Sequence, residues 1–176
     1  MTRYVALLRA VNVGGRIVKM QELRTLCESI PLSNVSTFIA SGNVIFESQK
    51  GPSAIETAIE KTLKAALGYD VVTMVRNVEQ IAAVAEYATA NRLDAGGGSL
   101  YVGFLKRAPT AAGVKAAVAL SNSVDTLSVA GTEFYWQARK SFAESTLTGG
   151  AIEKFLGPAT VRNINTVRRL VGRAQP

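Results

Sequence analysis

The sequence contains no histidine and only one cysteine, Cys27. Without an imidazole, three kinds of site are excluded: a histidine-assisted nucleophile, a histidine general base and a histidine-ligated metal. A lone cysteine forms no internal disulfide, and Cys27 shares the apolar side of a helical pattern with Leu23 and Ile30, which predicts a buried and inert thiol. The acids are scattered, so we expect no metal site, and the sequence names neither a reaction nor a cofactor.

Long apolar runs are also missing. No stretch reaches the about 18 apolar residues of a membrane helix, and residues 1–4 enter a strand pattern without a signal-peptide segment. The chain has 176 residues, 48% of them hydrophobic, which is enough for one sizeable core or two small fused units. We therefore expect a cytoplasmic protein that does not act at a membrane.

Acidic residues are absent from both ends of the chain. Residues 1–21 hold four basic side chains, residues 154–176 hold five, and neither segment contains Asp or Glu. The two ends carry +9 of a protein whose net charge is +7, so the remainder carries −2. If the ends meet in space, their field would attract an anionic partner. Two solvated basic faces are the alternative.

The first half of the chain alternates strand and helix patterns. An apolar run at 4–8 is followed by a helical stripe at 20–29, and Pro52-Ser53 opens a second helix in which Ser53 and Glu56 have the spacing of a capping box. Strand patterns occupy 35–40, 44–47 and 71–75. The order is β-α-β-β-α-β, the ferredoxin-like split unit, and Asn77 with Gln80 caps a third helix.

The second half repeats this order. Gly96-Gly97-Gly98 is the plainest linker, and strand, helix, strand, strand, helix and strand patterns follow it before a last helix capped by Asn163. We predict an α+β protein of two fused ferredoxin-like units, an internal duplication without visible sequence repetition. The predicted domains are residues 1–94 and 95–176.

Two polar loops are predicted to lie side by side. The first and second strands of a split unit run parallel, so the loop with Asn12, Gly14 and Gly15 should neighbour the turn Ser41-Gly42-Asn43, with Gly42 and Asn43 as its central pair. Glycines let the backbone approach a ligand closely, and outward amides favour anions. The spacing matches neither a Walker loop nor a dinucleotide fingerprint, so a simple hairpin and connecting loop is the alternative.

A third polar cluster precedes the last helix: Arg162, Asn163, Asn165 and Thr166. A helix N-terminus preceded by arginine can bind an anion. We predict that Arg162 and Asn163 come within reach of the two N-terminal loops, so that replacing Arg162 by Ala weakens anion binding with little effect on stability. Otherwise Arg162 is a surface residue at a strand end.

Three segments resemble the hallmarks of a known family. LLRAVNVGG (residues 7–15), SGNVIF (41–46) and RNINTVRRL (162–170) are similar to motifs of the Domain of Unknown Function 1697 family. The family pattern has Gly where Ala10 stands, Trp where Ile164 stands and Pro where Lys19 stands. The resemblance implies two fused ferredoxin-like units and implies no activity, because the family has no established one.

Three functions remain open. The first is binding of a small phosphate- or carboxylate-bearing ligand by the polar and glycine residues of the three motifs: Asn12, Gly14, Gly15, Ser41, Gly42, Asn43, Arg162, Asn163, Asn165 and Thr166. The second is nucleic-acid binding, although Asn43 and Ile45 stand where an RNA-recognition domain has its stacking aromatics. The third is a structural protein whose open sheets pair with another copy. The oligomeric state is not predicted.

Overall fold

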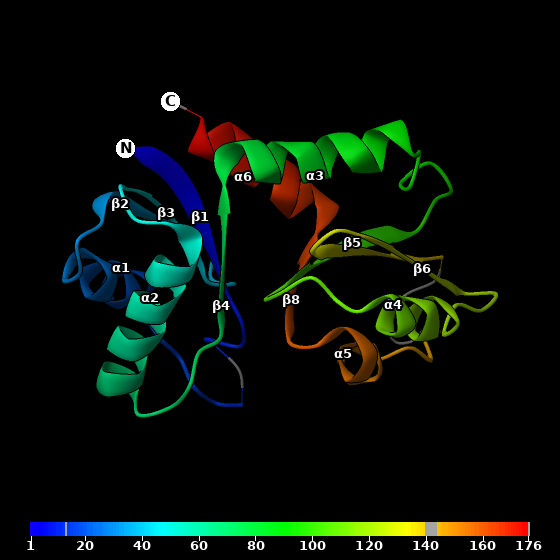
Figure 1. The fold of residues 1–176 in the computed structure, drawn as a ribbon, viewed down its shortest axis with the longest axis horizontal. Coiled ribbons are helices and arrows are strands. Elements are labelled where there is room, and N and C mark those ends of the chain that lie inside the picture. The colour runs from blue at the N-terminus through cyan, green and yellow to red at the C-terminus, as the bar shows by residue number, and fades with distance from the viewer. Residues whose placement is uncertain (13, 140–143, 176) are drawn as a thin grey trace. The chain divides into compact units, whose positions relative to one another are not determined.

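The computed structural model of the chain describes residues 1–12, 14–139 and 144–175. These residues form two compact units (Figure 1). Unit 1 comprises Met1–Ile81 and Leu170–Pro176, and unit 2 comprises Ala82–Arg169. Each unit contains one four-stranded antiparallel sheet, ordered β2-β3-β1-β4 in unit 1 and β6-β7-β5-β8 in unit 2. The predicted α+β fold with two ferredoxin-like units is therefore confirmed.

Unit 1 is built around its first strand. Its elements are β1 (Thr2–Leu8), α1 (Met20–Glu28), β2 (Ser33–Phe38), β3 (Asn43–Ser48), α2 (Pro52–Leu67) and β4 (Thr73–Asn77). Strand β1 pairs with both β3 and β4, and its residues 5–8 are at most 1% exposed, which explains why it reads as an unbroken apolar run. Leu23 and Cys27 of α1 share one core with Ile55 and Ile59 of α2.

The edge strand β4 has its outward amides bound by side chains. Glu60 Oε1 accepts from Thr73 N at 2.8 Å and Glu56 Oε1 accepts from Val75 N at 2.9 Å. The predicted capping box of Ser53 and Glu56 is therefore wrong: Gly51 precedes α2 without a side-chain cap, and the Glu56 side chain is needed at the sheet edge. A strand edge treated in this way offers few free donors to a second copy of the chain.

Unit 2 repeats the layout. It takes most of α3 (Val78–Ala90), which begins in unit 1, and then contains β5 (Ser99–Leu105), α4 (Ala111–Val118), β6 (Asp125–Ala130), β7 (Glu133–Ala138), α5 (Gly149–Leu156), β8 (Ala159–Asn163) and the start of α6 (Ile164–Ala174). Phe134 and Trp136 of β7 pack with Ile152 and Leu156 of α5 in its core. The chain returns to unit 1 inside α6, between Arg169 and Leu170.

The duplication is visible in the sequence once the strand register is known. Tyr4-Val5 of β1 lies opposite Arg76-Asn77 of β4, and Tyr101-Val102 of β5 lies opposite Arg162-Asn163 of β8. Equivalent positions of the two units therefore carry the same residues, which corrects the expectation that the repeat leaves no trace in the sequence. The domain limits at residues 94 and 95 stay a prediction. None of the described helices is long and apolar enough to cross a membrane.

Candidate functional site

The two polar loops of unit 1 lie together, as predicted, and Asn12 joins them. The side-chain amide of Asn12 donates to the carbonyl oxygen of Ala40 at 3.0 Å, and its Oδ1 accepts from the amide of Val18 at 2.6 Å. Leu8 N also donates to Gly42 O at 2.8 Å. The side chain of Asn12 is therefore bound within the protein as a clamp between two loops. Val13, between Asn12 and the glycines, lies outside the described residues.

The turn between β2 and β3 differs from the prediction. It spans residues 39–42, with positive φ at Ile39 (52°) and Gly42 (79°). Asn43 is the first residue of β3, is fully buried, and donates to Phe38 O at 2.9 Å and Ser41 Oγ at 3.0 Å. Gly42 and Asn43 are therefore not a central pair, because the Asn43 amide closes the turn from inside the sheet. Glycine is required at 42, where a Cβ would lie 2.7 Å from Val11 Cγ1.

The glycines of the first loop remain exposed. Gly14 (φ 66°) and Gly15 (φ 80°) have left-handed backbones, and a Cβ at either would meet nothing within 4 Å. The neighbouring Arg16 guanidinium lies 4.2 Å from the centroid of the Tyr69 ring, and the Tyr69 hydroxyl donates to Val11 O at 3.1 Å. The backbone of this loop is open to a ligand, while Arg16 is held against Tyr69.

Arg162 is buried, which rules out the alternative of a surface residue at the strand end. Its exposed fraction is 6%, and Nη1 donates to Thr160 Oγ1 at 2.7 Å and to Val161 O at 2.9 Å. Burial lowers the pKa of its guanidinium to about 10. Removing such a group leaves buried acceptors without a donor, so Arg162→Ala should cost stability. Arg162 belongs to unit 2, and its convergence with the loops of unit 1 stays a prediction.

The other residues of the third motif form the start of α6. Asn163 Oδ1 accepts from Asn165 N at 2.9 Å, which confirms Asn163 as the capping residue. Asn165 is exposed and Thr166 is half-buried in the first turn of the helix. The cap therefore uses the side-chain oxygen of Asn163, Oδ1. The side chain of Asn165 is accessible to solvent.

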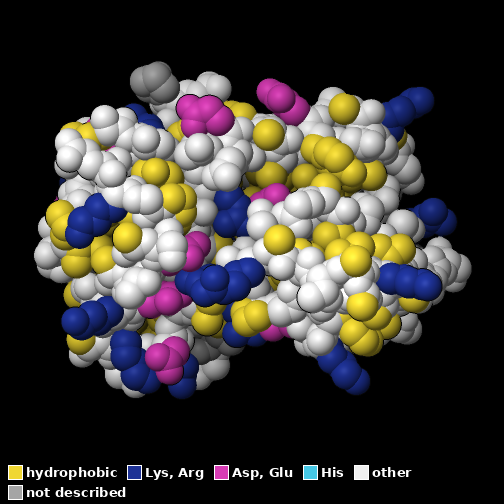
Figure 2. Space-filling model, in the orientation of Figure 1, with side chains coloured by type: hydrophobic (Ala, Val, Ile, Leu, Met, Phe, Trp, Pro, Cys, Tyr) yellow, Lys and Arg dark blue, Asp and Glu magenta, His cyan; other side chains and the backbone are white. Residues whose placement is uncertain are grey.

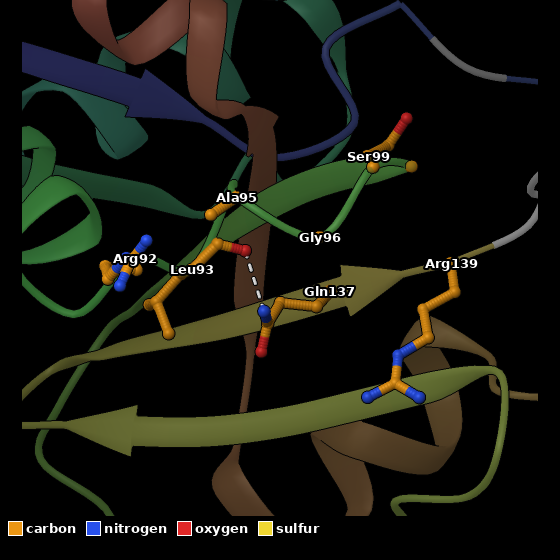
Figure 3. Close-up of a pocket in the computed structure, with 9 residues that line it drawn as sticks. Arg92, Leu93, Ala95, Gly96, Ser99, Gln137 and Arg139 are labelled. Carbon is orange, nitrogen blue, oxygen red and sulfur yellow. Dashed lines mark hydrogen bonds between the residues drawn. The ribbon is translucent and has the colours of Figure 1, made fainter.

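A pocket that the sequence did not predict lies within unit 2, where the end of α3 meets the start of β5 and the end of β7 (Figure 3). Its volume is about 300 Å³. The lining residues come from the segment after α3 and from the end of β7: Arg92, Leu93, Ala95, Gly96, Gly97, Gly98, Ser99, Gln137 and Arg139. The signal that could have found it is an arginine between a helix end and a triple glycine.

The end of α3 places an arginine where glycine is usual. Arg92 N donates to Thr89 O at 3.0 Å and Leu93 N donates to Ala88 O at 3.0 Å, the two hydrogen bonds of a Schellman motif. In such a motif the residue just after the helix has a left-handed backbone, and here that residue is Arg92, with φ 53°. Glycine adopts this conformation freely, whereas a residue with a Cβ costs roughly 1–2 kcal/mol. The backbone of Arg92 is therefore strained, and Arg92 is one of the residues that line the pocket.

Acidic groups are directed away from this pocket. Asp94 is the only acid between residues 91 and 99, and its Oδ2 lies 2.6 Å from Arg168 Nη2. That hydrogen bond lowers the pKa of the Asp94 carboxyl. None of the residues that line the pocket is Asp or Glu, so its wall carries the two positive charges of Arg92 and Arg139.

Backbone contacts hold the two sides of the pocket together. A Cβ on Gly98 (φ 89°) would lie 2.3 Å from Ala138 O, so only glycine permits the close approach to β7. Arg139 N donates to Val124 O at 2.9 Å. Between the arginines, Gln137 Nε2 donates to Leu93 O at 2.7 Å, as Figure 3 shows.

Other buried polar groups of unit 2 are structural. The carboxylate of Asp125 accepts from Trp136 Nε1 at 2.8 Å and from Ser145 Oγ at 2.7 Å. Tyr135 stacks on Tyr87, with 4.9 Å between ring centroids, and its burial raises the pKa of its hydroxyl. Within the described ranges, no group of three or more Cys, Asp or Glu side chains could hold a metal ion.

Two observations bear on nucleic-acid binding: the burial of the stacking positions in β3 and the distribution of charge on one face of the molecule. Asn43 and Ile45, at the stacking positions of β3, are 0% and 2% exposed, so no base could stack there. On the face that Figure 2 shows, Lys and Arg side chains form separate spots among acidic and uncharged groups.

The family model described as "Protein of unknown function (DUF1697)" matches residues 1–135. The chain belongs to the DUF1697 family. The match includes the motifs at residues 7–15 and 41–46, whereas the third motif at 162–170 lies beyond its end. No curated protein matches the chain.

The chain is similar over its whole length to a solved structure. It is the conserved bacterial protein SP0830 from Streptococcus pneumoniae, which is 20% identical, with a TM-score of 0.73 over 99% of both chains. At this identity the similarity shows the fold alone. The duplicated fold of this DUF1697 protein therefore has a counterpart, and its function must be argued from its own residues.

Proposed function

We propose that this protein binds a small anionic ligand, bearing phosphate or carboxylate, at the pocket of unit 2. The observation that carries the proposal is Arg92: a left-handed position that favours glycine holds an arginine, and that arginine lines a cavity. Backbone strain that a simpler residue would avoid is typical of functional positions.

The surroundings of Arg92 support the same conclusion. Arg139 adds a second guanidinium, the Asp94 carboxylate is bound by Arg168, and the loop of Gly96, Gly97 and Gly98 exposes backbone to the cavity. A volume of about 300 Å³ is at the lower end of the range for small-molecule sites. Because each exposed charge pair contributes about 1 kcal/mol or less, we expect a simple anion to bind weakly, with a dissociation constant in the millimolar range or above.

The test is Arg92→Gly, which removes the guanidinium and relieves the backbone. We expect a melting temperature at least equal to that of the wild type, together with about a fivefold loss of affinity for inorganic phosphate or glutarate by isothermal titration calorimetry. The control is Ala10→Gly, which relieves a similar left-handed backbone (φ 56°) in unit 1 and should leave binding unchanged. Unchanged binding in Arg92→Gly would refute the proposal.

The three motifs remain a second candidate site for the same class of ligand. Their support is the exposed backbone of Gly14 and Gly15 beside the basic residues of an acid-free segment. In this proposal the protein acts in the cytoplasm. Anion binding that survives Arg92→Gly but is lost on replacing Gly14 and Gly15 would favour this site over the pocket of unit 2.

A further inference from the structure

We infer that the ligand of the unit 2 pocket carries two anionic groups joined by a short uncharged segment. The inference rests on the proposed function and adds the chemical class of the ligand. Its starting point is the placement of the two arginines. Figure 3 shows the side chains of Arg92 and Arg139 on opposite sides of Gln137, without converging on one point. One compact anion would meet one guanidinium, whereas a ligand with an anionic group at each end would meet both.

Each arginine is fixed at its backbone by a different element. Arg92 is held by the two hydrogen bonds at the end of α3, and Arg139 follows β7 with its amide bound to Val124 O at 2.9 Å. In the described part of the chain, neither guanidinium is paired with a carboxylate. Two separate cations are thus available, and a guanidinium recognises phosphate or carboxylate through paired N–H donors.

The middle of the site is polar and uncharged. Gln137 Nε2 is committed to Leu93 O at 2.7 Å, which leaves the side-chain oxygen of Gln137 as an acceptor. The oxygen of an amide has two lone pairs and can accept hydrogen bonds from a ligand. A hydroxyl or amine on the segment that joins the two anionic groups would fit this acceptor.

The ligand class also follows from the size of the cavity. About 300 Å³ accommodates a short bisphosphate, dicarboxylate or phosphorylated carboxylic acid, but is small for a dinucleotide. An RNA strand also carries spaced phosphates, but it needs an open groove and stacking platforms. We therefore choose a small dianionic molecule and treat single-stranded RNA as an outcome of the test.

The experiment compares matched pairs of probes by calorimetry at constant ionic strength. The pairs are glutarate with butyrate, and propane-1,3-diyl bisphosphate with propyl phosphate. We expect the doubly anionic member of each pair to bind at least fivefold more tightly. Arg139→Gln should reduce that advantage to about twofold or less, since one exposed charge pair accounts for about a fivefold effect. Arg107→Gln, which removes an exposed charge elsewhere in unit 2, should preserve the advantage.

Equal affinity within both pairs, with binding still lost in Arg92→Gly, would overturn this inference and leave the proposed anion site standing. No binding of any probe to the wild type would overturn both. Tighter binding of an oligouridylate than of the bisphosphate, reduced by Arg139→Gln, would also overturn the inference, because the natural ligand would then be a strand.

Discussion

Strain at single residues marks both candidate sites. Among residues 1–12, 14–139 and 144–175, four non-glycine residues have positive φ: Ala10, Asn34, Ile39 and Arg92. Asparagine tolerates this conformation, but a β-branched residue such as Ile39 rarely adopts it. Ala10 and Ile39 flank the two loops that Asn12 joins, and Arg92 lines the pocket of unit 2. Asn34 lies at an irregularity in the register of β2, whereas the other three lie in loops, where a ligand could approach.

Ala10→Gly should raise the free energy of unfolding. The left-handed backbone (φ 56°) costs an alanine roughly 1–2 kcal/mol, and the entropy that glycine loses on folding returns about 0.5–1 kcal/mol of this. We expect a net gain of about 0.5–1 kcal/mol by urea denaturation. The control is Ala66→Gly in α2, an exposed helical position where glycine should cost about 1 kcal/mol. A loss of stability in Ala10→Gly would contradict this explanation.

The Cys27 thiol should react slowly in the folded protein. It is 1% exposed, and burial, with a smaller contribution from Glu28, raises its pKa from 9.0 to about 12. At pH 8 the thiolate fraction should fall roughly a thousandfold relative to the unfolded chain, and only the thiolate reacts. Iodoacetamide labelling of native protein should therefore be at least a hundredfold slower than in denaturant. Equal rates would show that the α1 face is open.

The same shift makes Cys27 a source of alkaline instability. The unfolded thiol ionises above pH 9, while the buried thiol stays neutral up to pH 12. Its contribution to the free energy of unfolding is thus complete below pH 9 and is lost as the pH rises toward 12. Cys27→Ala should flatten the fall in stability between pH 8 and pH 10.

Helix packing in unit 2 depends on a glycine inside a helix. A Cβ on Gly113 of α4 would lie 2.4 Å from the carbonyl oxygen of Phe155 in α5. Alanine is the better helix former by about 1 kcal/mol, but here it would force two backbones apart. We expect Gly113→Ala to lower the free energy of unfolding by about 1–3 kcal/mol. Gly172→Ala in α6, where a Cβ meets nothing within 4 Å, should raise it by about 0.5–1 kcal/mol. The same sign for both variants would contradict the packing argument.

Elements were predictable from sequence because their signals are local. Apolar alternation and helical stripes indicated each strand and helix in order, and the predicted cap of α3 is confirmed by the two hydrogen bonds between Asn77 and Gln80. Glu56 was assigned to the wrong partner because its acceptor role depends on Val75, 19 residues away. No pattern within α2 reveals that contact.

Sites were less predictable because they depend on non-local pairing. The motif residues were identified, but Asn12 and Asn43 bind the backbone of their own loops. The alternative of a surface position for Arg162 was wrong because neighbouring residues on both faces of β8, Ala159 and Thr160, are buried as well. Arg92, Gln137 and Arg139 line one pocket only because β5 pairs with β7, although Arg92 and Gln137 lie more than 40 positions apart in the sequence.

The whole molecule is linked by helices that each belong to both units. Helix α6 starts in unit 2, yet Leu170 and Ala174 belong to unit 1 and are fully buried. Leu170→Ala should therefore reduce the stability of unit 1 by about 2–5 kcal/mol. Hydrogen exchange should show faster exchange in β1 and β3, whereas Arg173→Ala, an exposed neighbour, should have no effect. Faster hydrogen exchange confined to unit 2 in Leu170→Ala would contradict the assignment of Leu170 to unit 1.

During synthesis on the ribosome, unit 1 must wait for its last segment, because α6 is made after the rest of unit 2. The strands of unit 1 are complete once residue 77 has been made, but its segment from Leu170 follows all of unit 2. At about 5–20 residues per second, translation needs roughly 5–20 s to cover that interval. Throughout that interval, the nascent N-terminal half lacks two buried side chains that belong to unit 1, Leu170 and Ala174. Chaperones that recognise apolar surface should thus bind this half until translation has passed the end of α6.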